Sequence, residues 1–490
     1  MSQKIGTIVK IEGVLLLILA ASMLPSLLIA VSKNETTSIN AFVVTACLCS
    51  MVGLFICLRL SNLQRQKLKG RDGFFIVALS WIIASLVGAV PFWLSGSVPT
   101  FFDAFFESVS GFSTTGASIF TDVETLPTSI LFWRSLTSWL GGMGIIMLMS
   151  ALFPALGIDG QITANVEIAG PTKSKLSAKF SDGAKEIYSI YVIMTLVETL
   201  LLKLRGLTWF DSLIHTFGTV STGGFSSYND NIGHFNSVYV EIIVAIFMLL
   251  AALNLTLYFT IPKNGLSRLL RDEETRFYTT LIIVAAGSVA LYNTVMTEFL
   301  DFGHSILNSF FQVISIITTT GYNTDNYDLW PTFSRIIIFA LFFIGGCSSS
   351  TGGGIKSIRI LVAYKMVRRS ISLKIHPNRI APVTLDGKEM SNDTLIKISN
   401  FVFTYILLLM IGFMLISLNG FDFMTNLSAS ASCLGNIGPG FSGIGPNMDF
   451  AMFSNFSKLV CSFLMITGRL ELYTILMLLS RYYWNPNKVK

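Results

Sequence analysis

Four short Thr/Gly-rich segments point to the coordination of an ion by backbone carbonyl oxygens. The third segment, residues 318–323, reads TTTGYN and follows a short apolar-aromatic run. Glycine lets consecutive carbonyls aim at one ion, because it reaches dihedral angles closed to other residues. The segments recur at intervals of about 100 residues, and four copies predict a fourfold arrangement within one chain. The predicted filter residues are Thr114, Thr115, Gly116, Ser221, Thr222, Gly223, Thr319, Thr320, Gly321, Asn436, Ile437 and Gly438.

The four segments also differ in ways that affect ion binding. The central glycines Gly116, Gly223, Gly321 and Gly438 are expected to supply the unusual dihedral angles. Only the third segment continues with the Gly-Tyr pair of potassium-channel filters, and Pro439 in the fourth has no N–H. We therefore expect one or two good ion sites rather than a long queue. The alternative is four ordinary glycine-containing loops between helices.

A glycine- and serine-rich stretch, residues 345–354, interrupts the apolar run expected to form the last helix of the third repeat. It has five glycines and four hydroxyl residues in ten positions, and each interior glycine costs a helix about 1 kcal/mol relative to alanine. Such a backbone at membrane depth must face water or protein, which predicts a movable gate beneath the filter. The alternative is a glycine kink for close helix packing. The predicted gate residues are Gly345, Gly346, Ser348, Ser349, Ser350, Thr351, Gly352, Gly353, Gly354 and Arg469.

Arg469 lies in an apolar segment, 464–472, where a charge is expensive and usually functional. Our hypothesis is that its guanidinium projects into the pathway below the filter, as a positive barrier or as a clamp on the carbonyls of the gate. The alternative is a structural ion pair with Glu471 or a neighbouring helix, although residues i and i+2 do not face each other on a helix. Arg134 and Arg335, near the outer starts of inner helices, are expected to snorkel or to pair with carboxylates.

The composition excludes a soluble protein. Hydrophobic residues make up 52% of the 490 residues and charged residues only 13%. Long uncharged apolar segments recur, and each is long enough to cross about 30 Å of hydrocarbon. The six cysteines lie mostly within or beside apolar runs, so we expect free thiols. The sequence contains no nucleotide-binding glycine motif, catalytic triad or paired-carboxylate site, and we expect no enzyme.

The predicted fold class is an all-α integral membrane protein, with four pseudo-repeated helix–pore loop–helix modules around one central pore. Two extra N-terminal helices bring the expected total to about ten transmembrane helices. The predicted boundaries are 1–72 for the N-terminal pair and 73–183, 184–274, 275–390 and 391–490 for the modules. Basic residues gather in the loops that leave the modules, which places these loops and both termini in the cytoplasm.

Acidic residues gather on the opposite side, around the short helices and the filters. Individually they could be solvated loop carboxylates or helix N-caps, but together they predict an acidic vestibule that concentrates cations. These residues are Asp103, Glu107, Asp122, Glu124, Asp211, Asp230, Asp325, Asp328, Asp422 and Asp449.

The filter segments, the extra N-terminal helices and the 345–354 stretch together resemble the Trk/Ktr/HKT superfamily of potassium transporters. The resemblance covers essentially the whole chain, including GP at 170–171 with KL at 175–176, and HPN at 376–378 leading to LDG at 385–387. The extra helices make the TrkH branch a closer match than KtrB. The resemblance implies a homodimer with one pore per protomer, K⁺ as the transported ion and a cytosolic nucleotide-binding ring of TrkA type as partner. Plant members that admit sodium often have serine where this chain has Gly116, which favours potassium.

These observations together predict a potassium uptake pore in the plasma membrane of a prokaryote. The first rival is a secondary transporter that couples K⁺ to H⁺ or Na⁺, since such proteins also use broken helices and internal repeats. They typically need titratable groups at the midplane, and the sequence offers no convincing acidic pair there. A more remote rival is a membrane-embedded enzyme or an assembly scaffold.

Overall fold

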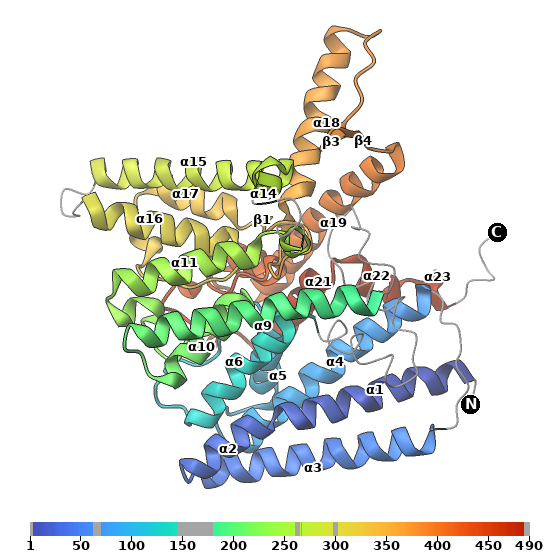
Figure 1. The fold of residues 1–490 in the computed structure, drawn as a ribbon, viewed down its shortest axis with the longest axis vertical. Helices are drawn as coiled ribbons and strands as arrows, with labels where there is room; N and C mark the ends of the chain where they lie inside the picture. The colour runs from blue at the N-terminus through green and yellow to red at the C-terminus, as the bar shows by residue number, and fades with distance from the viewer. Residues whose placement is uncertain are drawn as a thin grey trace.

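The computed structural model describes residues 3–61, 70–144, 180–259, 265, 267–296 and 302–484. Most of these residues are helical, and the long helices run side by side, with the start of α1 and the end of α23 on the same side (Figure 1). The GP and KL motifs at 170–171 and 175–176 lie outside the described residues. The fold class predicted from the sequence, an all-α membrane protein, is confirmed.

The N-terminal region forms three helices rather than the two predicted. α1 (Gln3–Ser22) ends just before α2 (Leu24–Ser32), and α3 (Thr36–Arg59) returns beside them. The break follows from Pro25, which lies in the first turn of α2 and cannot donate the hydrogen bond of a continuing helix. α1 and α3 approach closely at two glycines, since a Cβ on Gly53 would lie 2.8 Å from the carbonyl oxygen of Gly13.

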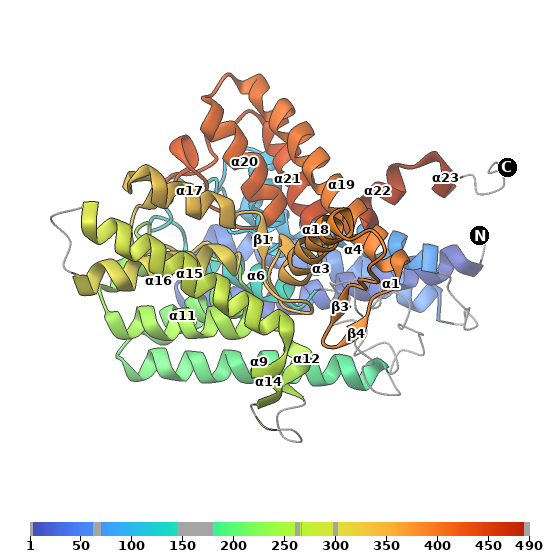
Figure 2. The same cartoon turned by 90° about the horizontal axis from the view of Figure 1, so that it is seen from above.

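Four modules follow, and each consists of a long helix, a short helix, a Thr/Gly strand and a further helix. In the first module these helices are α4 (Gly70–Leu94), α5 (Phe101–Phe112) and α6 (Thr128–Gly142), and in the second they are α9 (Phe180–Leu204), α10 (Trp209–Val220) and α11 (Val238–Ala252). In the third they are α15 (Glu273–Met296), α16 (Phe302–Ile317) and α17 (Thr332–Leu341), and in the fourth α19 (Asn392–Ile416), α20 (Phe423–Gly435) and α21 (Asn455–Arg469). In Figure 2 the fourth module, orange to red, and the second, green, lie on opposite sides of the centre.

Six of the described helices are long and apolar enough to cross a membrane, or seven if the bent pair of α21 and α22 (Tyr473–Leu479) counts as one span. The remaining membrane helices of the modules are short. α11 has 15 residues and α17 has 10. The predicted helix from 131 to 153 is described only as α6, up to Gly142.

The last helices of the third and fourth modules are both broken. In the third module the interruption predicted at 345–354 is observed: α17 is followed by a loop and α18 (Ser357–Ile375), with β1 (Ile344–Gly345) paired in parallel to β2 (Ile355–Lys356) across the loop. In the fourth module the chain bends by 119° between α21 and α22, a break that the sequence did not predict. Glu471 and Leu472 at that bend both have positive φ, which a right-handed helix cannot contain.

Smaller elements complete the chain. α18 and the segment that follows it project from the rest of the molecule as an arm, and the hairpin of β3 (Thr384–Leu385) and β4 (Lys388–Glu389) turns back alongside the lower part of α18 (Figure 1). The remaining short helices are α12 (Leu255–Tyr258), α14 (Ser267–Arg271), α23 (Arg481–Trp484), η1 (Asn231–Phe235), η2 (Tyr327–Leu329), η3 (Ser417–Asn419) and η4 (Ser442–Ile444).

Candidate ion pathway

The four predicted filter segments meet in a closed ring. A Cβ placed on one glycine of each strand would collide with backbone of the next strand, so glycine is required wherever the strands touch. These contacts run from Gly116 to the Gly223 oxygen at 2.5 Å, from Gly224 to the Thr320 oxygen, from Gly321 to the Ile437 oxygen, and from Gly438 to the Thr115 oxygen at 2.6 Å. The fourth strand thus returns to the first, and segments over 300 residues apart surround one axis.

The strands share one backbone conformation. Each has a left-handed residue with φ between 54° and 59° at Thr114, Thr222, Thr319 and Asn436, and a left-handed glycine two residues later at Gly116, Gly224, Gly321 and Gly438. The residue between them donates its N–H to the carbonyl five positions earlier. These bonds run from Thr115 to Ser110, from Gly223 to Gly218, from Thr320 to Ser315 and from Ile437 to Ser432. The four segments are therefore equivalent residue by residue.

This equivalence corrects the predicted register of the second strand. Gly223 was expected to supply the unusual dihedral angle, but the positive φ lies at Gly224. Thr222 and Gly223 therefore correspond to Thr114 and Thr115, and Ser221 lies one position before the repeated triplet. The two consecutive glycines allowed either alignment, and only their dihedral angles distinguish them. Gly224 is a residue that the sequence analysis missed.

A hollow on the outer side of the ring is lined by all four left-handed glycines. Pro439, Asn447 and Asp449 of the fourth module and Asn229 of the second also line it. In the described ranges, no group of three or more His, Cys, Asp or Glu side chains could hold a metal ion.

The acidic vestibule is smaller than predicted, because three of its ten carboxylates are buried. Asp103 and Asp211 each sit in the first turn of a short helix, with their N–H groups bonded to Thr100 and Thr208, and Glu107 is fully buried. Asp103 also pairs with Lys458 at 2.6 Å. These three are thus neither vestibule groups nor N-caps, because Thr100 and Thr208 are the N-caps of their helices and Glu107 lies in the middle of α5. The alternative interpretation as an N-cap holds for Asp422, which caps α20.

The exposed outer carboxylates keep the negative charge that attracts cations. A hydrogen bond from the side chain of Asn229 lowers the pKa of Asp122, and one from the side chain of Thr425 lowers the pKa of Asp422. Burial raises the pKa of Asp449, which lines the hollow. Asp122 and Asp422 therefore stay ionised down to a lower pH than usual.

A buried ion pair joins the outer ends of the first two strands. Arg134 donates to Glu107 at 2.5 Å and to the Ser226 oxygen at 3.0 Å, and its guanidinium lies 3.6 Å from the centre of the Phe225 ring. Glu107 in turn accepts the N–H of Ile119 at 2.9 Å. Of the two roles expected for Arg134, pairing is therefore observed and snorkelling is not.

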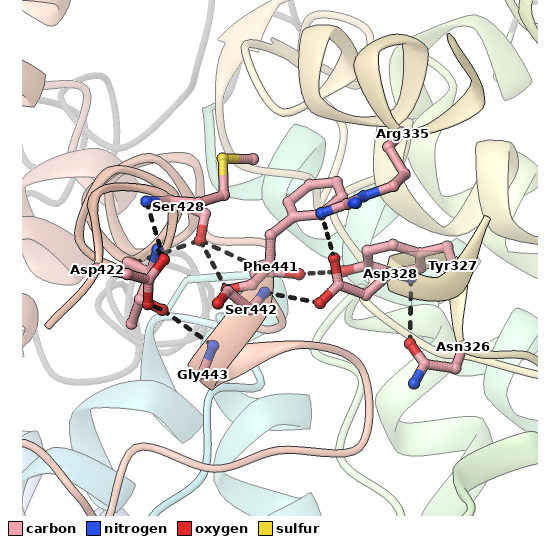
Figure 3. Close-up of polar contacts among 12 residues, drawn as sticks. Asn326, Tyr327, Asp328, Arg335, Asp422, Ser428, Phe441, Ser442 and Gly443 are labelled. Carbon is pink, nitrogen blue, oxygen red and sulfur yellow. Dashed lines mark hydrogen bonds and ion pairs between the residues drawn. The ribbon is translucent and has the colours of Figure 1, made fainter. Parts of the chain in front are cut away.

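The fourth strand is braced by the third module, as Figure 3 shows. The Tyr327 hydroxyl donates to the Gly440 oxygen at 2.9 Å, and the Ser442 N–H donates to Asp328 at 2.8 Å. Asp328 also pairs with Arg335 at 2.9 Å, so that arginine too is paired. Contacts from the third module therefore fix the segment that follows Pro439.

The loop between α17 and α18 lies directly against the inner side of the ring. The Gly353 N–H donates to the hydroxyl of Thr319 at 2.7 Å, and a Cβ on Gly352 would lie 3.0 Å from the Thr318 oxygen. The Cys347 N–H donates to the Ala252 oxygen at 2.8 Å, which fastens the loop to the end of α11. The predicted gate segment therefore contacts the filter strand itself.

Two basic side chains hold the loop by its carbonyl oxygens. Arg469 donates to Thr351 at 2.5 Å and also to Gly141 and Gly142 at the end of α6, at 2.7 and 2.6 Å. Lys356, buried and absent from the predicted site, donates to the Gly352 oxygen at 2.5 Å. Glu471, considered above as a partner for Arg469, pairs with Arg359 at 2.7 Å. A second hollow, lined by residues 349–354, Lys356, Arg469 and Glu471, lies at this loop.

The fold and the ring of strands define a class of membrane protein with four pore modules in one chain. The sequence profile of the TrkH family, described as "Cation transport protein", matches residues 39–485. The chain belongs to the TrkH family.

Several relatives match along almost their full length. The Trk system potassium uptake proteins TrkG and TrkH of Escherichia coli (strain K12) are 34% and 33% identical over 96% and 97% of this chain, and over 97% and 99% of their own lengths. The crystal structure of the potassium transporter TrkH from Vibrio parahaemolyticus superimposes with a TM-score of 0.87 at 30% identity, covering 99% of this chain and 100% of that one.

Proposed function

We propose that this protein is the pore subunit of a potassium uptake system and conducts K⁺ across the plasma membrane through the ring of four strands. The ring carries the proposal, because carbonyl oxygens presented by left-handed glycines can replace the hydration shell of an ion. The choice of K⁺ rests on the relatives, which are named as potassium uptake proteins. Gly116, at the position where serine would favour sodium, agrees with that choice.

The 345–354 loop is, in the same proposal, the gate of this pathway. It is fastened to the Thr319 hydroxyl on one side and to Arg469 on the other, so it obstructs the inner side of the ring. Its abundant glycine and serine leave it little intrinsic structure, and a partner could therefore shift its equilibrium by binding one arrangement more tightly. We infer a homodimer with cytoplasmic termini, regulated by a cytosolic TrkA-type nucleotide-binding ring.

The filter assignment is tested by Gly116→Ser and Gly321→Ser. At both positions φ is positive and a Cβ would meet backbone of the next strand, so either variant should admit more sodium or abolish uptake. The measurement is K⁺ and Na⁺ uptake in cells that lack their own potassium systems. Gly96→Ser is the matched control, since Gly96 also has positive φ but a Cβ there would have no atom within 4 Å.

An unchanged preference for potassium in both filter variants would contradict the proposal. Current–voltage recording of the purified protein in bilayers adds a second outcome. Reversal at the potassium equilibrium potential with no dependence on protons supports a pore, whereas a proton-dependent reversal potential supports coupled transport.

A further inference from the structure

The first turn of α15 contains two adjacent carboxylates, Glu273 and Glu274, which bind two different parts of the molecule. The start of the helix is already capped, because Asp272 accepts both the N–H and the hydroxyl of Thr275 at 2.8 Å. Glu273 and Glu274 are therefore not needed as caps, and the positive end of the helix dipole favours their negative charge.

Glu274 holds the 345–354 loop at its start and the helix α18 where the loop ends. It accepts the N–H and the hydroxyl of Ser348, both at 2.7 Å. It also accepts the hydroxyl of Ser357 at 2.9 Å and the N–H of Ile358 at 3.2 Å. The carboxylate is buried, with 4% of its surface exposed, so water cannot replace these bonds.

Glu273 holds the cytoplasmic arm instead. It forms an ion pair with Lys365 of α18 and accepts the N–H of Asp386 at 3.0 Å, while its own N–H donates to the Asp386 side chain at 3.0 Å. Asp386 and Gly387 form the turn of the β3–β4 hairpin, and Lys365 also donates to the Thr384 oxygen at 2.7 Å. The middle of α18 and the hairpin turn that lies beside it are therefore tied to the same helical turn as the loop.

α15 is itself attached to the filter. It packs along α16, the short helix before the third strand, and the Tyr278 hydroxyl donates to the Ile317 oxygen at 3.3 Å. One capped helical turn thus connects the arm, the loop and the base of a filter strand. Adjacent residues of such a turn cannot move independently, because the helical hydrogen bonds fix their dihedral angles.

We propose that Glu273 and Glu274 form a coupling device: Glu274 keeps the loop against the filter, and Glu273 transmits displacement of the arm to that contact. This inference rests on the proposed gating role of the loop. In this proposal Glu274 is a positioning residue of the gate. Displacement of the arm, including the β3–β4 hairpin, reaches the loop through Glu273.

The test uses the purified full-length protein in liposomes and two measurements. The first is potassium flux per molecule. The second is labelling of Cys347 by N-ethylmaleimide, read on its peptide by mass spectrometry, because Cys347 is buried in the loop next to Ser348. Glu274→Ala should raise both flux and labelling on the order of tenfold, a range typical of coupled sites, with the K⁺/Na⁺ preference unchanged.

Glu273→Ala is the decisive variant, because Glu273 contacts the arm and not the loop. The proposal expects raised Cys347 labelling in this variant as well. Glu274→Gln should stay near the wild type, because its amide oxygen can accept the three bonds that Oε1 accepts and its NH2 can donate to the Ser348 hydroxyl. It serves together with Ser348→Ala if Glu274→Ala folds poorly. Asp393→Ala is the matched control, since it breaks an exposed pair with Lys397 at the start of α19.

If Cys347 in Glu273→Ala is labelled no faster than in the wild type, Glu273 does not couple the arm to the loop, whatever Glu274→Ala does. If both flux and labelling in Glu274→Ala equal those of the wild type, Glu274 does not hold the loop against the filter. If the wild-type protein carries no potassium at all, the proposed function fails instead, and labelling still reports how the loop is held.

Discussion

At the scale of single residues, the ring depends on two left-handed positions in each strand. Glycine fills the second position of each strand, but the first is occupied by threonine in three strands and by Asn436 in the fourth. Asparagine adopts this conformation more readily than most residues. Its side chain donates to the Thr115 hydroxyl at 3.0 Å and to the Met465 oxygen at 2.9 Å, so Asn436 also fastens the fourth strand to the first.

The register of the second strand leads to a prediction about its two glycines. Gly224→Ala should abolish uptake without rescue, because the methyl group meets the Thr320 carbonyl and φ is positive. Gly223→Ala is limited only by space, since its Cβ would lie 2.8 Å from the Cβ of Ser138. Uptake assays should therefore show recovery of Gly223→Ala when Ser138→Gly is added.

The same assays can contradict this assignment. If Ser138→Gly restores uptake in Gly224→Ala, or if Gly224→Ala alone is tolerated, the left-handed position of the second strand is Gly223 and not Gly224.

At the scale of helices, buried ion pairs tie the short pore helices to the inner helices. Glu107 of α5 and Arg134 of α6 form one such pair, and Asp103 of α5 and Lys458 of α21 form another. A buried pair is weak evidence for net stabilisation, but removing one partner leaves an uncompensated charge. We interpret both pairs as devices that fix the positions of helices around the strands.

Arg134→Met should therefore destabilise the protein by about 3–5 kcal/mol, since Glu107 remains buried without its partner. The double variant Glu107→Gln with Arg134→Met should recover part of that loss. Thermal unfolding in detergent measures both. Lys397→Met is the control, because its pair with Asp393 leaves both side chains 73% exposed and should contribute less than about 1 kcal/mol. Equal losses in the two single variants would refute the interpretation.

At the scale of the whole molecule, the loop is held by charged side chains from three parts of the chain. Glu274 comes from the start of α15, Lys356 from the end of the loop, and Arg469 from the end of α21. Arg469 also binds the end of α6, and the Cys347 N–H donates to Ala252 of α11, so all four modules meet at this loop.

Arg469→Ala should raise potassium flux per molecule or weaken its regulation, because the loop and α6 lose their shared donor. Flux and folded yield must be measured on one preparation. Lys397→Ala is the control, since that lysine forms only an exposed pair with Asp393 at the start of α19. A lower folded yield with unaltered flux per molecule would make Arg469 a structural residue only.

The sequence by itself determined the features that depend on local composition and period. Apolar segments long enough to span a bilayer identified a membrane protein, and four Thr/Gly segments at a long interval identified four modules. The glycine-rich stretch at 345–354 could not continue a helix, and the structure has a loop there. These predictions needed no knowledge of which distant residues come together.

Tertiary structure alone decided the features that depend on contacts between distant residues. Arg469 meets Gly141 across 328 positions of sequence, and Glu274 meets Ser348 across 74. The position of Gly224 against the Thr320 oxygen likewise depends on a neighbouring module. Residue type shows that a carboxylate, a guanidinium or a glycine is present. Which backbone group it meets is decided by the packing of whole helices, because that packing minimises unpaired polar groups and voids across the entire molecule.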